Sequence, residues 1–93
     1  MTQHELFTPS IVIHLTPEER AIATRPIVAD TLGGWQTLLH DLLPRLDCYG
    51  AFEATDSELR RCYRYAYDYA SGGYQGRFKA ILAAARRAGW QAV

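Results

Sequence analysis

A Gly-Gly-aromatic-Gln motif occurs twice in this chain, and its residue types suit the binding of an anion. The copies are Gly33-Gly34-Trp35-Gln36 and, further along the chain, Gly72-Gly73-Tyr74-Gln75. Each copy precedes a stretch with helical periodicity, so its amides would lie at a helix N-terminus, where unpaired N–H groups and the helix dipole favour negative charge. The glutamine side chains could donate to a phosphate or to a base edge. An arginine precedes each glycine pair at the same spacing, at Arg25 and Arg64.

The motif also has a purely structural interpretation. In that interpretation the glycines make a tight connection, Trp35 and Tyr74 fill the core, and the glutamines cap backbone groups. The motif is not a phosphate loop of the nucleotide-binding type, because neither copy contains Gly-Lys-Ser/Thr and no parallel strand is expected beside it. The sequence leaves the ligand-binding and structural interpretations open.

The second part of the chain mixes basic and tyrosine side chains, a combination typical of nucleic-acid binding. Arginine pairs bidentately with phosphate, and aromatic rings stack on unpaired bases. Residues 1–56 contain three Arg and eight Asp or Glu, a net charge of −5, whereas residues 57–93 contain seven Arg or Lys and two acidic residues, a net charge of +5. This asymmetry indicates an anion-binding face. Alternatively, the two parts complement each other within a monomer or across a homodimer.

These patterns predict a set of binding residues for nucleic acid or for a protein partner. Arginine and tyrosine are also favoured in protein–protein interfaces, so the two kinds of partner remain alternatives. The predicted set is Arg60, Arg61, Arg64, Tyr65, Gly73, Gln75, Arg77 and Lys79, with a possible second site at Arg25, Gly34 and Gln36.

Patterns of catalytic and metal-binding residues are missing from the sequence. The three histidines are scattered, and neither His-Glu-x-x-His nor Cys-x-x-Cys occurs. Cys48 and Cys62 lack metal-ligand spacing, and a buried free cysteine usually acts as a small apolar side chain. The sequence therefore predicts a non-enzymatic binding protein without a metal or a cofactor.

The two motifs belong to a longer internal repeat. The shift that places Gly33 on Gly72 also places Thr16 on Thr55, Glu19 on Glu58, and many apolar residues on apolar ones. We expect a single domain with pseudo-two-fold symmetry, in which a strand–helix–Gly-Gly–helix unit is used twice. Copy one covers about residues 10–46 and copy two about residues 49–88.

Local signals predict a mainly α fold of the α+β type, with four helices and a minimal antiparallel β pair. Two Thr-x-x-Glu capping boxes, at residues 16–19 and 55–58, start helices. Pro44 should kink or shorten the second helix, and Gly89 should cap the last one, with Trp90 folding back. The predicted strands cover about residues 11–15 and 50–54, and the predicted helices 17–25, 35–46, 56–70 and 74–88.

Helical spacing also assigns faces to the third helix. It places Tyr67 on the buried stripe, whereas Tyr65 and Tyr69 lie toward water. Arg60, Arg61 and Arg64 are likewise expected to face solvent.

Composition and termini bear on the location of the protein. With 93 residues, 48% hydrophobic and 22% charged, the chain suits one globular domain. Two cysteines do not form a disulfide framework, and neither a signal peptide nor an apolar run long enough to span a membrane is visible. We therefore expect a cytoplasmic protein that does not enter membranes.

The spacing of Arg25-Pro26, Gly33-Gly34-Trp35-Gln36, Arg64-Tyr65-Ala66 and Gly72-Gly73-Tyr74-Gln75 resembles that of a family of small, uncharacterised bacterial and phage proteins. The resemblance covers about residues 15–82 and implies an origin in bacteria or their mobile elements, with no activity attached. Proteins of that origin are often inhibitors or regulators that act by binding. From the basic and aromatic residues, the leading expectation is nucleic-acid binding through the basic second copy. The alternative is an inhibitor or adaptor that binds a host protein complex.

Overall fold

The structure, a computed structural model, describes residues 10–26, 34–68 and 74–92. Gly33, Gly72, Gly73 and Tyr69, about which the sequence makes predictions, lie outside the described residues. The described elements are β1 (Ser10–His14), α1 (Pro17–Ala23), α2 (Gly34–Leu42), a 3₁₀ turn η2 (Leu43–Arg45), β2 (Ala51–Thr55), α3 (Asp56–Tyr63), a π-helical segment η3 (Arg64–Asp68) and α4 (Gln75–Arg87). The predicted mainly α fold with a small antiparallel sheet is confirmed for these ranges.

The two strands form the antiparallel sheet that the sequence predicts. Their register pairs Ile13 with Phe52, and Leu15 N–H donates to the Gly50 carbonyl at 2.9 Å just beyond the ladder. Side chains alternate between the two faces of a strand, so Ile13, Phe52 and Ala54 are buried against the helices. Gly50 has φ +82°, which lets the chain turn into β2.

Both predicted capping boxes start helices. The Thr16 hydroxyl accepts from Glu19 N–H and the Glu19 carboxylate accepts from Thr16 N–H; Thr55 and Glu58 repeat the arrangement at α3. α2 ends at Leu42 and continues as the 3₁₀ turn, which begins one residue before Pro44. The predicted early stop is therefore confirmed. Its cause is that proline has no N–H to donate to the next helical hydrogen bond.

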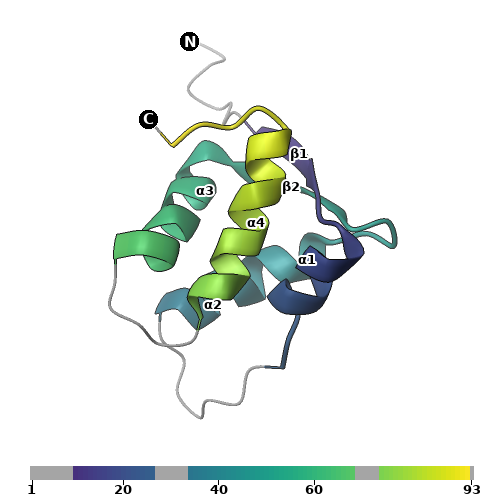
Figure 1. The fold of residues 1–93 in the computed structure, drawn as a ribbon, viewed down its shortest axis with the longest axis horizontal. Helices are drawn as coiled ribbons and strands as arrows, with labels where there is room; N and C mark the ends of the chain where they lie inside the picture. The colour runs from purple at the N-terminus through teal and green to yellow at the C-terminus, as the bar shows by residue number, and fades with distance from the viewer. Residues whose placement is uncertain (1–9, 27–33, 69–73, 93) are drawn as a thin grey trace, which may run out of the picture.

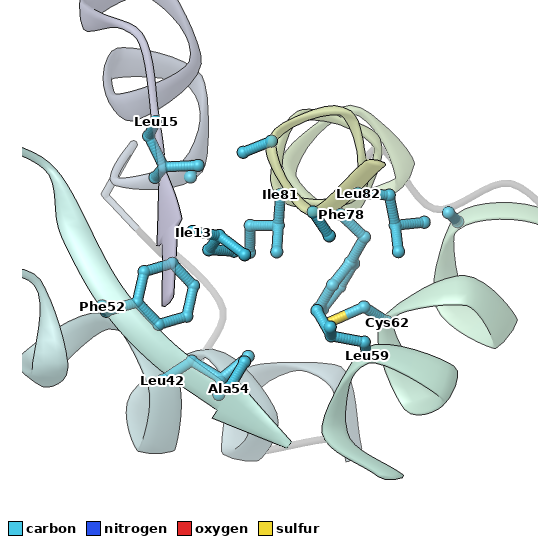
Figure 2. Packing of buried hydrophobic residues seen from close by; sticks show 14 of the residues in the cluster. Ile13, Leu15, Leu42, Phe52, Ala54, Leu59, Cys62, Phe78, Ile81 and Leu82 are labelled. Atoms are coloured by element: carbon cyan, nitrogen blue, oxygen red, sulfur yellow. The ribbon is translucent and has the colours of Figure 1, made fainter. Parts of the chain in front are cut away.

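Helix α4 is the centre of the packing. It lies against α1, α3 and β1, and Figure 1 shows it in the foreground with α3 on its left and α1 on its right. Its apolar stripe of Phe78, Ile81 and Leu82 is fully buried. Figure 2 shows this stripe facing Ile13 of β1 and Cys62 of α3. One core therefore joins β1, α3 and α4.

The C-terminal end of α4 closes as the sequence predicts. Gly89 has φ +101°, and its N–H donates to the Arg86 carbonyl at 3.0 Å. Trp90 N–H donates to the Ala85 carbonyl at 3.0 Å, which completes a Schellman motif. The indole N–H of Trp90 donates to Asp56 at 2.9 Å, and the side chain is only 8% exposed.

The predicted faces of Tyr65 and Tyr67 are wrong. Tyr65 is half-buried and its ring stacks on Phe78, with centroids 5.3 Å apart. Tyr67, expected on the buried stripe, is 46% exposed. Helical spacing gives the direction of the buried stripe. The elements packed beside the helix decide which side chains on either side of that stripe are also buried. Here α4 and the start of α2 cover the Tyr65 flank.

Candidate binding surface

The described parts of the two glycine motifs contact each other at the edge of the core, where Trp35 and Tyr74 are partly buried. The rings of Trp35 and Tyr74 stack with centroids 5.1 Å apart and an interplanar angle of 25°. Gln36 is buried, at 2% exposure. A Cβ on Gly34 would stand 2.2 Å from the Tyr65 hydroxyl oxygen, so the Tyr65 ring occupies the space that a larger residue would need. These contacts favour the structural interpretation of the first motif.

We expect Gly34→Ala to lower the free energy of unfolding by about 1 kcal/mol, because the new methyl group displaces the Tyr65 ring from its stack on Phe78. In a Tyr65→Leu background the space is free, and the same change should be neutral or stabilising, since alanine is the better helix former. Urea unfolding of the four proteins in this double-mutant cycle measures the coupling. An equal cost of Gly34→Ala in both backgrounds would contradict the packing role of Gly34.

Arg77 links the start of α4 to the end of α1. Its guanidinium donates to the carbonyl oxygen of Arg25 and, at 3.0 Å, to that of Pro26. It also lies over the Trp35 ring, 6.0 Å from the centroid. Burial, together with the nearby charge of Arg25, lowers the pKa of Arg77 from its ordinary value. Arg77 thus connects the start of α4 to the residues after α1, with Arg25 exposed beside it.

A second predicted basic residue is also held by intramolecular partners. Arg60 pairs with Asp56 at 2.7 Å and donates to the Ala92 carbonyl at 2.9 Å. Outside the predicted set, Arg87 of α4 pairs with Glu19 of α1 at 2.5 Å, so basic and acidic parts of the chain meet at this point. The charge asymmetry of the sequence is therefore partly compensated within the monomer.

An exposed basic and aromatic surface remains between η3 and α4. The ammonium group of Lys79 lies 5.2 Å, and the guanidinium of Arg86 6.0 Å, from the centroid of the Tyr67 ring. Tyr63 extends the surface, with its ring centroid 4.9 Å from that of Tyr67. Neither cation has a carboxylate within 4.0 Å among the described residues. We call Tyr63, Tyr67, Lys79 and Arg86 the Tyr67 surface.

The remaining predicted residues lie apart from these contacts or beside the motifs. Arg61 is exposed and lines a hollow of about 260 Å³ with His40 and Asp41 of α2. Arg64 is exposed in η3, and Gln75 is half-buried at the start of α4. Of the predicted set, Lys79 alone belongs to the Tyr67 surface. The sequence did not predict Tyr67 as a binding residue. The one signal for this surface in the sequence is the spacing of Lys79 and Arg86, which lie two turns apart and therefore share a face of one helix.

The two cysteines lie in different environments. Cys62 is fully buried, and burial raises the pKa of its thiol to about 12, so it stays protonated. Cys48 is exposed in the turn before β2. Within the described ranges, no three His, Cys, Asp or Glu side chains gather where they could hold a metal ion.

Comparison with protein-family models, curated proteins and solved structures gives no match for this chain. Among the described helices, none has the length and apolar character needed to cross a membrane.

Proposed function

We propose that the protein binds nucleic acid through the Tyr67 surface. The observation that carries this proposal is the pair of cations, Lys79 and Arg86, over an exposed tyrosine ring. Exposed Lys and Arg side chains without a carboxylate partner attract phosphate, and their binding releases counterions from the nucleic acid. Arg60 and Arg77 are left out of this surface because intramolecular partners hold them.

The geometry favours contact with the phosphate backbone over stacking on bases. Lys79 and Arg86 are separated by about 10.5 Å along the axis of α4, from the rise per residue of a helix. Both cations engage the Tyr67 ring, so this ring orients them and is less available to a base. Backbone contacts carry no sequence information, so binding should be similar for different sequences.

The double variant Lys79→Ala/Arg86→Ala should bind a fluorescent DNA duplex of about two helical turns at least tenfold more weakly at low salt. Removal of two phosphate contacts should also reduce the slope of log K against log salt by about 1.8. Fluorescence anisotropy at several salt concentrations measures both quantities, on two duplexes of unrelated sequence.

Arg87→Ala is the matched control for a lost charge on the same helix. Arg87 pairs with Glu19 and donates to the His14 carbonyl at 3.0 Å, away from the proposed surface. The Arg87→Ala variant should therefore change the affinity for DNA by less than about twofold, once the affinity is corrected for any fraction of unfolded protein. Equal losses for the two proteins, or binding insensitive to salt, would refute the proposal.

The second candidate function is a protein-binding inhibitor or adaptor, of the kind encoded by phages and mobile elements. Tyr49 favours it, because this side chain is 82% exposed. The turn that carries Tyr49 is held by the Asp47 carboxylate, which accepts from Tyr49 N–H at 2.8 Å and Ala51 N–H at 2.9 Å. A fixed, exposed aromatic residue is typical of an interface anchor.

A pull-down from bacterial lysate with and without nuclease separates the two functions. Loss of all bound material after nuclease treatment supports nucleic-acid binding. A protein complex that survives nuclease and is lost with Tyr49→Ala supports the inhibitor or adaptor.

We also propose that the fold is an internal duplication. The element order β1-α1-α2 is followed by β2-α3-α4, and both first helices start with capping boxes. The ladder pairs Ile13 with Phe52, which are equivalent positions of the internal repeat. An antiparallel ladder related by a two-fold axis must contain such a self-equivalent pair, so this register supports the proposal.

A further inference from the structure

The hydrogen-bond pattern of the sheet defines which backbone groups point away from it. Leu15 N–H donates to the Gly50 carbonyl, which makes this a hydrogen-bonded pair. Hydrogen-bonded and non-hydrogen-bonded pairs alternate along an antiparallel ladder. From this register, the residues that turn their amide and carbonyl groups to the two outer edges are Ser10, Val12 and His14 of β1 and Ala51, Glu53 and Thr55 of β2.

The outer edge of β2 is already occupied. Ala51 N–H donates to the Asp47 carboxylate, and the Ala51 carbonyl accepts from Asp47 N–H, both at 2.9 Å. The Glu53 carbonyl accepts from Arg45 at 3.3 Å, and Thr55 N–H donates to the Glu58 carboxylate at 2.9 Å. The same chain thus blocks the addition of a strand next to β2.

Within the part of the chain that the structure describes, the outer edge of β1 is open at its centre. Among the described residues, nothing donates to the Val12 carbonyl or accepts from the Val12 amide. The Val12 side chain is 51% exposed, one of the few large apolar side chains exposed in the described ranges. At the end of the strand the His14 carbonyl already accepts from Arg87 at 3.0 Å, so the open part of this edge is at Val12.

We propose that β1 pairs with β1 of a second copy of this chain. An antiparallel pairing about a two-fold axis at Val12 lets the two Val12 residues exchange both hydrogen bonds. Ser10 then faces His14 of the second copy, so no like charges stand opposite each other. The dimer has a four-stranded sheet in the order β2-β1-β1-β2.

Closure of the sheet favours a second copy as the occupant. Because both outer edges of the four-stranded sheet are blocked β2 edges, the assembly stops at a dimer. A peptide of another protein could also pair with the β1 edge, but without forming this closed assembly. If the full chain is a monomer, such a peptide is the better candidate.

Val12→Pro tests the interface while leaving the fold intact. The Val12 amide points outward, so proline removes no hydrogen bond of the β1–β2 ladder, and edge strands tolerate proline there. Sedimentation-velocity measurements over a micromolar concentration series should show a wild-type dimer and at least tenfold weaker dimerisation of Val12→Pro. Glu53→Pro is the matched control, because Glu53 faces Val12 across the ladder and its amide points to the opposite edge. It should leave dimerisation unchanged.

Two further measurements keep the test decisive if a proline variant fails to fold. Val12→Lys keeps the amide but places a charge at the edge and should also weaken dimerisation at least tenfold. Hydrogen exchange of the Val12 amide should slow as the wild-type concentration rises through the dimerisation range. A monomer at all concentrations, or a dimer that Val12→Pro and Val12→Lys leave intact, would overturn the proposal.

Discussion

Phe78→Ala is expected to lower the free energy of unfolding by about 3–5 kcal/mol. Phe78 is fully buried in α4, the helix that packs on α1, α3 and β1. Its ring stacks on Tyr65, with centroids 5.3 Å apart, and meets the Tyr74 ring edge-on at 6.4 Å. Alanine would leave a cavity at the centre of this packing. Since small domains have only about 5–15 kcal/mol of stability, much of it would be lost.

The same helix offers a control. Gly76 is exposed, and a Cβ there would meet no atom within 4 Å. Gly76→Ala should therefore stabilise the protein by about 0.5–1 kcal/mol. Urea unfolding followed by circular dichroism measures both variants. If Phe78→Ala cost no more than an ordinary surface substitution, Phe78 would not be at the centre of the core.

Glu58→Gln is expected to lower the free energy of unfolding by about 1–2 kcal/mol at neutral pH. Hydrogen bonds between partly exposed charged groups typically contribute this much to stability. Arg45 binds the Glu58 carboxylate through two hydrogen bonds, at 2.8 and 2.7 Å. Glu58 also accepts from Thr55 N–H at the start of α3. Glutamine keeps this cap, because Gln serves as well as Glu in a capping box. The variant therefore isolates the ion pair.

The ion pair also makes stability depend on pH. The hydrogen bonds from Arg45 lower the pKa of Glu58 from 4.5 to about 2 in the folded protein. Between these two values the unfolded chain binds a proton that the folded chain does not, so acid favours unfolding. The stabilisation by Glu58 is complete above about pH 5 and disappears as the pH falls toward 2. Exposure of the Arg45 side chain to solvent limits the effect to about 1–2 kcal/mol.

The pH dependence is measured by urea unfolding of both proteins from neutral pH down to about pH 2.5. Groups other than Glu58, such as Glu19 with its pKa lowered by Arg87, act alike in both proteins and cancel in the difference. The gap between wild type and Glu58→Gln should narrow below pH 4.5. A gap that stays constant over the whole acid range would contradict the assigned role of the ion pair.

Local signals in the sequence determined the elements of this fold. The Thr16 and Thr55 capping boxes, the stop at Pro44 and the Gly89 cap each depend on residues within a few positions along the chain. The β-branched run of the first strand, and the position of the second in the repeat, predicted the sheet. Capping and helix-stop interactions form between near neighbours, so the residue types are sufficient to predict them.

The tertiary structure alone decided what each side chain on the surface contacts. Arg77 and Lys79 are close neighbours on one helix and both basic, yet Arg77 binds the end of α1 and Lys79 lies over Tyr67. Tyr65 and Tyr67 likewise exchange their expected environments. These outcomes depend on partners far along the chain, as in the contact of Arg77 with Arg25. Helical periodicity gives the direction of a side chain, whereas its burial and its partner depend on which distant elements pack beside it.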